Sequence, residues 1–218
     1  MGGIAFFDLD KTVLAVNSAP LLYRRGRREG MVTFAQGLAS QLAFLLYGLG
    51  VRGVDDVIRS AAAACRGMHE DDLVAWNQRF WDEELQDRVR PGARRALERH
   101  RAAGDAVLLI TASNQGLASI VARALEFDEA LSPRWVSDGG RLTGTCEEPL
   151  CAGAGKVTHA TNAARRRGVE LAACTFYSDS YSDRPLLEAV GKPVAVHPDP
   201  RLRRLASGRD WPIEEWGG

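Results

Sequence analysis

The sequence of 218 residues is 45% hydrophobic and 26% charged, and its 28 basic and 28 acidic residues give a formal net charge of zero. A chain of this length allows one domain with its own core, or one domain that carries a smaller insertion. Because the charges balance, no nucleic acid is predicted as a partner. The composition leaves the oligomeric state open.

The predicted elements begin with a short buried strand, because residues 4–8 form an apolar run that ends in an aspartate. Residues 18–90 then show apolar positions at spacings of three and four, which is typical of helices, and no strand pattern. After Pro91, which suits the first turn of a helix, helices and apolar strands alternate. Strands are predicted at 106–110, 173–178 and 192–197, and helices at 91–104, 115–125, 155–168 and 184–191. A further strand and a hairpin are predicted between 129 and 144, with the hairpin turn at Asp138, Gly139 and Gly140.

Alternation of helices with fully apolar strands indicates a parallel sheet that helices cover on both faces. We therefore predict an α/β fold, a Rossmann-like parallel sheet core with an inserted all-helical cap domain. The core domain is expected to comprise residues 1–15 and 91–218, and the cap is expected to comprise residues 16–90.

The cysteines and the apolar segments bear on location. Cys65, Cys146, Cys151 and Cys174 are too scattered for a zinc site or a disulfide framework, which favours reduced thiols in the cytoplasm. The most apolar segment, residues 38–51, is shorter than the roughly 20 residues that a membrane span requires. We therefore expect a cytoplasmic protein with no transmembrane segment, and a buried or interfacial helix at 38–51.

Two aspartates follow the first predicted strand in the stretch DLDKT. Asp8 and Asp10 are two residues apart, so in an extended segment their side chains project to the same side. Two neighbouring carboxylates repel each other and need a cation or hydrogen-bond donors to stay ionised. The pair therefore points to a functional role, although a single Asp-x-Asp at a strand end often serves as a turn or helix cap.

Other polar groups follow the later strands, at the edge where open parallel sheets bind their ligands. The second predicted strand leads into Thr111, a later strand leads into Asp179 and Asp183, and Lys156 begins a helix after the stretch CAGAG. Several carboxylates without arginine partners favour Mg²⁺, which accepts one or two carboxylates together with a phosphate. Binding of the phosphate itself is favoured by the hydroxyl of Thr111, by the backbone amides after it and by Lys156.

Four motifs in this order, DLDKT, LLITASN, GAGK and YSDSYSD, resemble the four motifs of the haloacid dehalogenase (HAD) superfamily of phosphohydrolases. The resemblance covers essentially the entire chain and is to the phosphoserine-phosphatase-like branch, in which a helical cap follows the first motif. Within that branch the chain is similar to the bacterial subfamily IB hydrolases, which share the start FFDLDKT and the ending SDSYSDRPLLEAVGKPVAVHPD. The resemblance implies a phosphatase that requires Mg²⁺ and acts on a small-molecule phosphate ester.

The resemblance also implies a role for each matching residue. Asp8 would be the nucleophile that forms an aspartyl-phosphate, and Asp10 would be the general acid that protonates the leaving alcohol and then the base that activates water. To act at neutral pH, Asp10 needs a raised pKa. Mg²⁺ would be held by the carboxylates of Asp8 and Asp179 and by the backbone carbonyl of Asp10.

The remaining motif residues would bind the phosphate. Thr111 and the amide of Ala112 would bind the phosphoryl oxygens, and Lys156 would offset their charge. Asp183 would orient Lys156 or a metal-bound water. Lys11 stands where the superfamily commonly has glycine, and its side chain is expected to point away from the site.

The substrate is less well defined by the sequence. Thr12, Asn17 and Asn114 are candidate substrate contacts, with a structural role in the turn as the alternative for Thr12. Phosphoserine phosphatases of this branch have a glutamate nine residues after the nucleophile, where this chain has Asn17, and the departure counts against phosphoserine. A lipid or amphiphilic phosphate is an alternative substrate, because of the apolar segment at 38–51, and a non-catalytic phosphate-binding protein is a minor alternative function.

Overall fold

A six-stranded parallel sheet forms the centre of the protein, whose computed structural model describes residues 2–30 and 53–217. Every neighbouring pair of strands in this sheet is parallel. The strands lie in the order β3(Glu129–Leu131), β2(Ala106–Ile110), β1(Ile4–Phe7), β6(Thr175–Ser178), β7(Lys192–Val196) and β8(Ile213–Glu214). The predicted Rossmann-like α/β fold is thereby confirmed.

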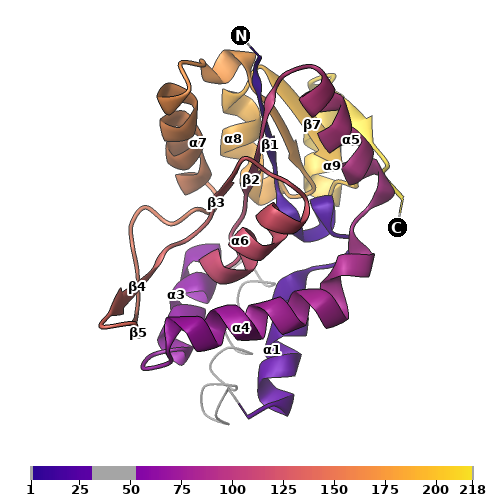
Figure 1. Ribbon diagram of the computed structural model, residues 1–218. Helices are drawn as coiled ribbons and strands as arrows, with labels where there is room; N and C mark the ends of the chain where they lie inside the picture. The colour runs from indigo at the N-terminus through magenta and orange to yellow at the C-terminus, as the bar shows by residue number, and fades with distance from the viewer. Residues whose placement is uncertain (1, 31–52, 218) are drawn as a thin grey trace.

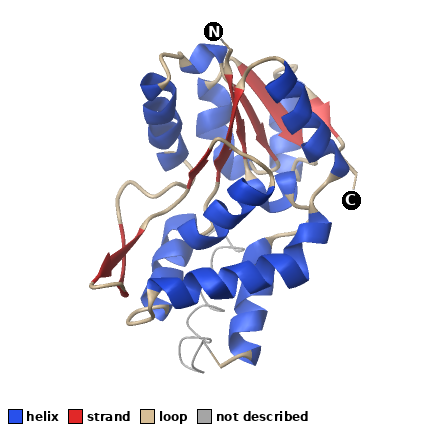
Figure 2. Ribbon diagram, viewed as in Figure 1, coloured by secondary structure: helices blue, strands red, loops and turns tan. Residues whose placement is uncertain are grey.

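Helices cover both faces of the sheet (Figures 1 and 2). One face packs against α5(Pro91–Ala102) and α6(Gln115–Ala124), and the other packs against α7(Gly155–Arg166), α8(Arg184–Ala189) and α9(Pro200–Gly208). Alternate residues of a strand serve the two faces, so in β1 Phe7 joins the cluster with α5 and α6 while Phe6 joins the cluster with α7 and α8. Because both faces are covered, the central strands β1 and β2 are apolar along their whole length.

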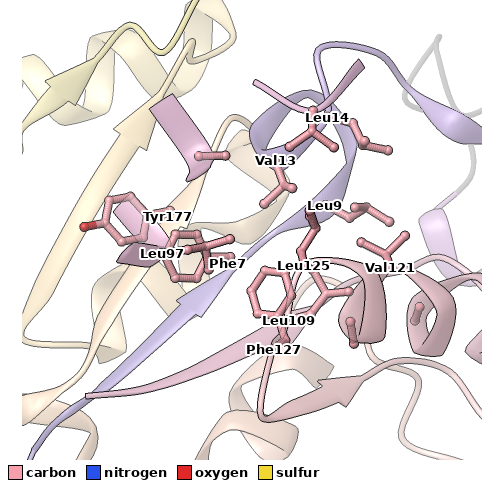
Figure 3. Packing of buried hydrophobic residues seen from close by; sticks show 14 of the residues in the cluster. Phe7, Leu9, Val13, Leu14, Leu97, Leu109, Val121, Leu125, Phe127 and Tyr177 are labelled. Atoms are coloured by element: carbon pink, nitrogen blue, oxygen red, sulfur yellow. The ribbon is translucent and has the colours of Figure 1, made fainter. Parts of the chain in front are cut away.

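Phe7 lies inside one of these two hydrophobic clusters (Figure 3). Its ring stacks on Tyr177 of the neighbouring strand, with ring centroids 4.7 Å apart, and meets Phe127 edge-on at 5.7 Å. Leu9, two residues further along the chain, is fully buried in the same cluster. The core therefore holds the chain on both sides of Asp8, and this fixes the backbone from which the Asp8 side chain projects.

Further helices lie beyond the carboxyl ends of the strands (Figure 1). They are α1(Ser18–Arg28), α3(Val54–Ala64) and α4(Glu70–Phe80), followed by the helical turns η2(Trp81–Leu85) and η3(Gln86–Arg88). Acidic residues occupy the first turns of α3 and α4, where they complement the helix dipole. The helical prediction for 18–90 is confirmed for the described part of that range, and the apolar helix expected at 38–51 lies outside the described residues.

A two-stranded hairpin, β4(Trp135–Asp138) and β5(Arg141–Cys146), projects from the sheet and packs against these helices. The predicted turn is confirmed, because Gly139 has a positive φ of 54° between the two strands. The backbone of Leu142 accepts a hydrogen bond from Gly67 N at 2.8 Å. A shared hydrophobic cluster joins hairpin and helices, formed by Ala62, Leu73, Trp76, Trp135 and Leu142. The predicted division into residues 1–15 with 91–218 and residues 16–90 therefore separates the hairpin from the helices that it contacts.

Two elements near the end of the chain were not predicted. Helix α9 begins after Asp199, whose side chain accepts hydrogen bonds from Arg201 N at 2.8 Å and Leu202 N at 2.9 Å. An aspartate followed by Pro200 is a helix start signal that the sequence does carry. Strand β8 has two residues and pairs with β7, so it is too short to leave a periodic pattern.

Candidate active site

Three neighbouring strands deliver the predicted catalytic motifs to one edge of the sheet. Asp8 follows β1, Thr111 follows β2, and Asp179 follows β6, and β1 lies between the other two strands. The chain leaves β1 toward β2 on one side and reaches β6 on the other, so this edge is a topological switch point, where open α/β sheets bind ligands.

A cavity of about 230 Å³ opens at this edge. It is lined by the following residues predicted for the site: Asp8, Asp10, Asn17, Thr111, Ala112, Lys156, Asp179 and Asp183. Thr12 and Asn114 are not part of this lining. The structure thus brings together residues that are up to 175 positions apart in the chain.

Lys156 lies between two carboxylates. Its Nζ is 2.6 Å from Asp8 Oδ1 and 2.8 Å from Asp183 Oδ2, and its side chain is 3% exposed. Burial opposes the charged form of Lys156, yet Asp183 and Asp8 outweigh it and raise the lysine pKa above its usual range. Ser178 Oγ donates a further hydrogen bond to Asp183 Oδ2 at 2.7 Å, which holds Asp183 in position. Lys156 is therefore a permanent cation beside the predicted nucleophile.

Asp8 is buried and Asp10 is half-buried, and their pKa values rise for related reasons. Burial raises the pKa of Asp8 well above its usual value, because Lys156 compensates it only in part. Burial also raises the pKa of Asp10, although Ser18 N at 2.7 Å and Ser113 Oγ at 3.3 Å from its two oxygens oppose the rise. The direction for Asp10 is the one that a general acid at neutral pH requires.

Asp179 is a buried carboxylate with few compensating partners. Burial and the neighbouring Asp183 raise its pKa to about 7. Thr12 is fully buried and binds Asp179 twice, since Thr12 Oγ1 accepts a hydrogen bond from Asp179 N at 2.9 Å and lies 3.4 Å from Asp179 Oδ1. These contacts support the structural alternative for Thr12, which is to hold the turn that presents Asp179.

Asn17 and Asn114 both act as helix N-caps. Asn17 Oδ1 accepts a hydrogen bond from Ala19 N at 3.0 Å at the start of α1, and Asn114 Oδ1 accepts one from Leu117 N at 3.1 Å at the start of α6. Asn114 Oδ1 also accepts a hydrogen bond from Asn77 Nδ2 at 3.0 Å, which links α6 to α4. Asn17 lines the cavity described above and Asn114 lines an adjoining one, so both stay candidate substrate contacts.

Three residues at the site were missed or misjudged from the sequence. Ser18 and Ser113 hold Asp10, and their only local signal is their place beside the helix starts, where backbone amides lack partners. Lys11 was expected to point away from the site, but it lines the cavity, and its charge opposes the rise that burial causes in the pKa of Asp179. Lys11 has a φ of 58°, in the left-handed region that glycine adopts easily, which agrees with the glycine that the superfamily commonly has at this position.

The donor groups at the site fit a magnesium ion bound mostly by oxygen. In residues 2–30 and 53–217, no group of three or more histidine, cysteine, aspartate or glutamate side chains is placed to hold a metal. The expected ligand set needs only the carboxylates of Asp8 and Asp179 with the backbone carbonyl of Asp10, and Mg²⁺ usually completes its shell with water and phosphate. Asp179 is a buried carboxylate whose charge Lys11 and Lys156 offset only in part, so a bound cation would compensate it further.

Comparison with known proteins agrees with this site. A family model for haloacid dehalogenase-like hydrolases matches residues 5–188. A Mycobacterium tuberculosis protein named phosphoserine phosphatase is 37% identical over 97% of this chain and 70% of its own length. A structure from Bordetella pertussis Tohama I, described as a protein with unknown function, shares 29% identity with a TM-score of 0.86 and 98% coverage of both chains. A phospho-aspartyl intermediate analogue of phosphoserine phosphatase shares the fold, with a TM-score of 0.72, 17% identity, and coverage of 99% of this chain and 95% of the other.

The fold and these matches define a phosphoric monoester hydrolase, which confirms the predicted enzyme class. The chain belongs to the haloacid dehalogenase-like hydrolase family, in its phosphoserine-phosphatase-like branch. Among the helices described, none combines the length and the apolar character that crossing a bilayer requires.

Proposed function

We propose that this protein is a Mg²⁺-dependent phosphomonoesterase that hydrolyses a small organic phosphate through an aspartyl-phosphate on Asp8. The observation that carries the proposal is the shared cavity in which Asp8, Asp10, Asp179 and Lys156 meet. Family membership supports it, because three of the four motif segments supply these residues and the remaining one, LLITASN, supplies Thr111. The phospho-aspartyl analogue of a protein with the same fold supports the covalent intermediate.

In the first step, one oxygen of Asp8 attacks phosphorus while the bond from phosphorus to the leaving oxygen breaks. Lys156 contacts Asp8 Oδ1, which directs the attack to Oδ2 and keeps a positive charge beside the phosphoryl oxygens. Asp10 gives its proton to the leaving oxygen, and Ser18 and Ser113 orient its carboxyl group for this transfer. The raised pKa of Asp10 favours the protonated form that this step needs.

In the second step, a water molecule attacks the aspartyl-phosphate, the bond from phosphorus to Asp8 breaks, and Asp10 accepts the proton of the water. Thr111 and the amide of Ala112 bind the phosphoryl oxygens in both steps. Asp8, Asp179 and the carbonyl of Asp10 would hold Mg²⁺. The bound ion supplies positive charge that lets the anionic nucleophile and the anionic phosphate approach each other.

The test is hydrolysis of p-nitrophenyl phosphate with Mg²⁺ by the wild type and by three variants. Asp8→Asn is expected to lose activity by several orders of magnitude, because an amide cannot form the acyl phosphate. Asp10→Asn is expected to lose about 10²–10⁴-fold, the usual contribution of a general acid. Asp138→Asn, an exposed residue at the hairpin turn, is the matched control and should keep wild-type activity.

Circular dichroism spectra of all variants should match the wild type, so that loss of activity reports on chemistry. Chelation of Mg²⁺ should abolish activity, and added Mg²⁺ should restore it. An Asp8→Asn variant that keeps its activity would refute the assignment of the nucleophile.

A further inference from the structure

A second cavity, of about 150 Å³, adjoins the catalytic one. Its walls come from α1, α3, α4, α6 and the hairpin, and they include Leu22, Ile58, Leu73, Trp76, Leu117 and Trp135. Among the described residues that line it, none is an aspartate, glutamate, lysine, arginine or histidine. This apolar cavity therefore offers buried hydrocarbon and aromatic surface, and no described counter-charge for an ionic group.

The two cavities meet beside the predicted general acid. Ala112 and Ser113 line both of them, and Ser18 lines the apolar one. Ser113 Oγ lies 3.3 Å from Asp10 Oδ2 and 3.3 Å from Ser18 Oγ, while Ser18 N donates to Asp10 Oδ1 at 2.7 Å. Asp10 must reach the leaving oxygen to protonate it. The group attached to that oxygen therefore starts at Ser18 and Ser113, where the apolar cavity begins.

We propose that the apolar cavity binds the leaving group, so that the enzyme prefers phosphate esters of uncharged, apolar alcohols over esters of amino alcohols or amino acids. This inference rests on the proposed function, because it assigns Asp10 to the leaving oxygen. A cavity of this volume in a protein interior accommodates a benzene ring. The leaving group that fits it is therefore a single ring or an alkyl chain of about six carbons.

The physical basis of the preference has two parts. Each methylene that moves from water into apolar surroundings strengthens binding about fourfold. An ammonium group in the same place loses its hydration and finds no described carboxylate in the cavity wall, so it is disfavoured. Asn17, at the mouth of the catalytic cavity, is uncharged and uses its carbonyl oxygen to cap α1, so it does not replace a carboxylate.

The experiment measures phosphate release from methyl, propyl, butyl and hexyl phosphate by the wild-type enzyme with Mg²⁺. The expected result is a rise in kcat/KM of about fourfold for each methylene up to about six carbons. Butyl phosphate and 3-aminopropyl phosphate have the same shape but differ in charge, and butyl phosphate is expected to be about tenfold better or more. O-phosphoserine should be a poorer substrate than butyl phosphate.

Variants of α3 and α4 test the location. Ala61 lies in the wall of the apolar cavity. Ala61→Phe fills the cavity, so the kcat/KM for hexyl phosphate divided by that for methyl phosphate should fall toward one. Ala61→Asp adds a carboxylate and should raise the ratio of 3-aminopropyl to butyl phosphate. Val74→Phe is the matched control, because Val74 is 45% exposed on α4 outside the cavity, and it should keep the wild-type ratios.

The outcomes separate this inference from the proposed function. If the wild type hydrolyses methyl phosphate through Asp8 but shows no dependence on chain length, or prefers 3-aminopropyl phosphate, the inference is overturned and the phosphatase proposal stands. If no ester is hydrolysed, or hydrolysis survives Asp8→Asn, both proposals fall together. Wild-type ratios in Ala61→Phe would also overturn the assigned location.

Discussion

Asp179 allows a quantitative prediction about stability, because its carboxyl group has a pKa of about 7 in the folded chain without metal, against an ordinary 3.8. Between these two values the folded state keeps a proton that the unfolded state has released. The raised pKa therefore makes the protein more stable at low pH, and this stability is lost as the pH rises through the window toward 7. The physical cause is burial, followed by repulsion from the nearby Asp183.

The magnitude follows from the width of the window. Between pH 5.5 and pH 8, Asp179 should lower the free energy of unfolding by about 2 kcal/mol, at about 1.4 kcal/mol per pH unit up to the folded pKa. For a chain of this size, that change corresponds to a fall in Tm of about 4–8 °C. The assay is thermal unfolding in chelator at both pH values, for the wild type and for Asp179→Asn.

The comparison between the two proteins isolates this group, because other titrating residues are common to both. The wild type should lose about 2 kcal/mol more than Asp179→Asn between pH 5.5 and pH 8. Added Mg²⁺ should stabilise the wild type more at pH 8 than at pH 5.5, since binding to the ionised carboxylate competes with the proton. Asp138→Asn should follow the wild type. Equal pH dependence in the wild type and Asp179→Asn would refute the reasoning.

Two further predictions concern stability at the site and in the core. Lys156→Met leaves the buried carboxylates of Asp8 and Asp183 without their cation, and it should lower the free energy of unfolding at pH 8 by about 3–5 kcal/mol, measured in urea. At pH 5.5 the loss should be smaller, because protons bound to the carboxylates replace the cation. An equal loss at both pH values would contradict this prediction. Gly92→Ala places a Cβ 2.3 Å from Trp216 Cβ, and this clash should lower the free energy of unfolding by about 1–3 kcal/mol, measured by thermal unfolding. An unchanged Tm would contradict this, because it would mean that Trp216 moves away at no cost.

Much of the site was predictable because its residues follow strand ends in chain order. Asp8, Thr111 and Asp179 each come directly after a predicted strand, and strands that alternate with helices make a parallel sheet. Lys156 was predictable from its place at a helix start within a recognised motif. Such signals are local, so they can be recognised in the sequence without knowledge of the tertiary contacts that these residues make.

Other features were not predictable, because they depend on which distant segments meet. The hairpin β4–β5 was recognised from its turn glycines, yet nothing in its sequence shows that it packs on α3 and α4. Thr12 was left between two roles until its contacts with Asp179, 167 positions away, were seen. Asn114 has the local pattern of a helix cap, and only its bond to Asn77 reveals that it also joins α6 to α4.

The amino-acid sequence by itself determined the apolar strands, the helix starts and the acidic residues that follow the strands, because hydrophobic periodicity and capping act over a few residues. Only the tertiary structure decided that Lys156 lies between Asp8 and Asp183, that Ser18 and Ser113 hold Asp10, and that an apolar cavity adjoins them. These contacts join segments far apart in the chain, and their geometry depends on strand order and on how helices pack across the end of the sheet.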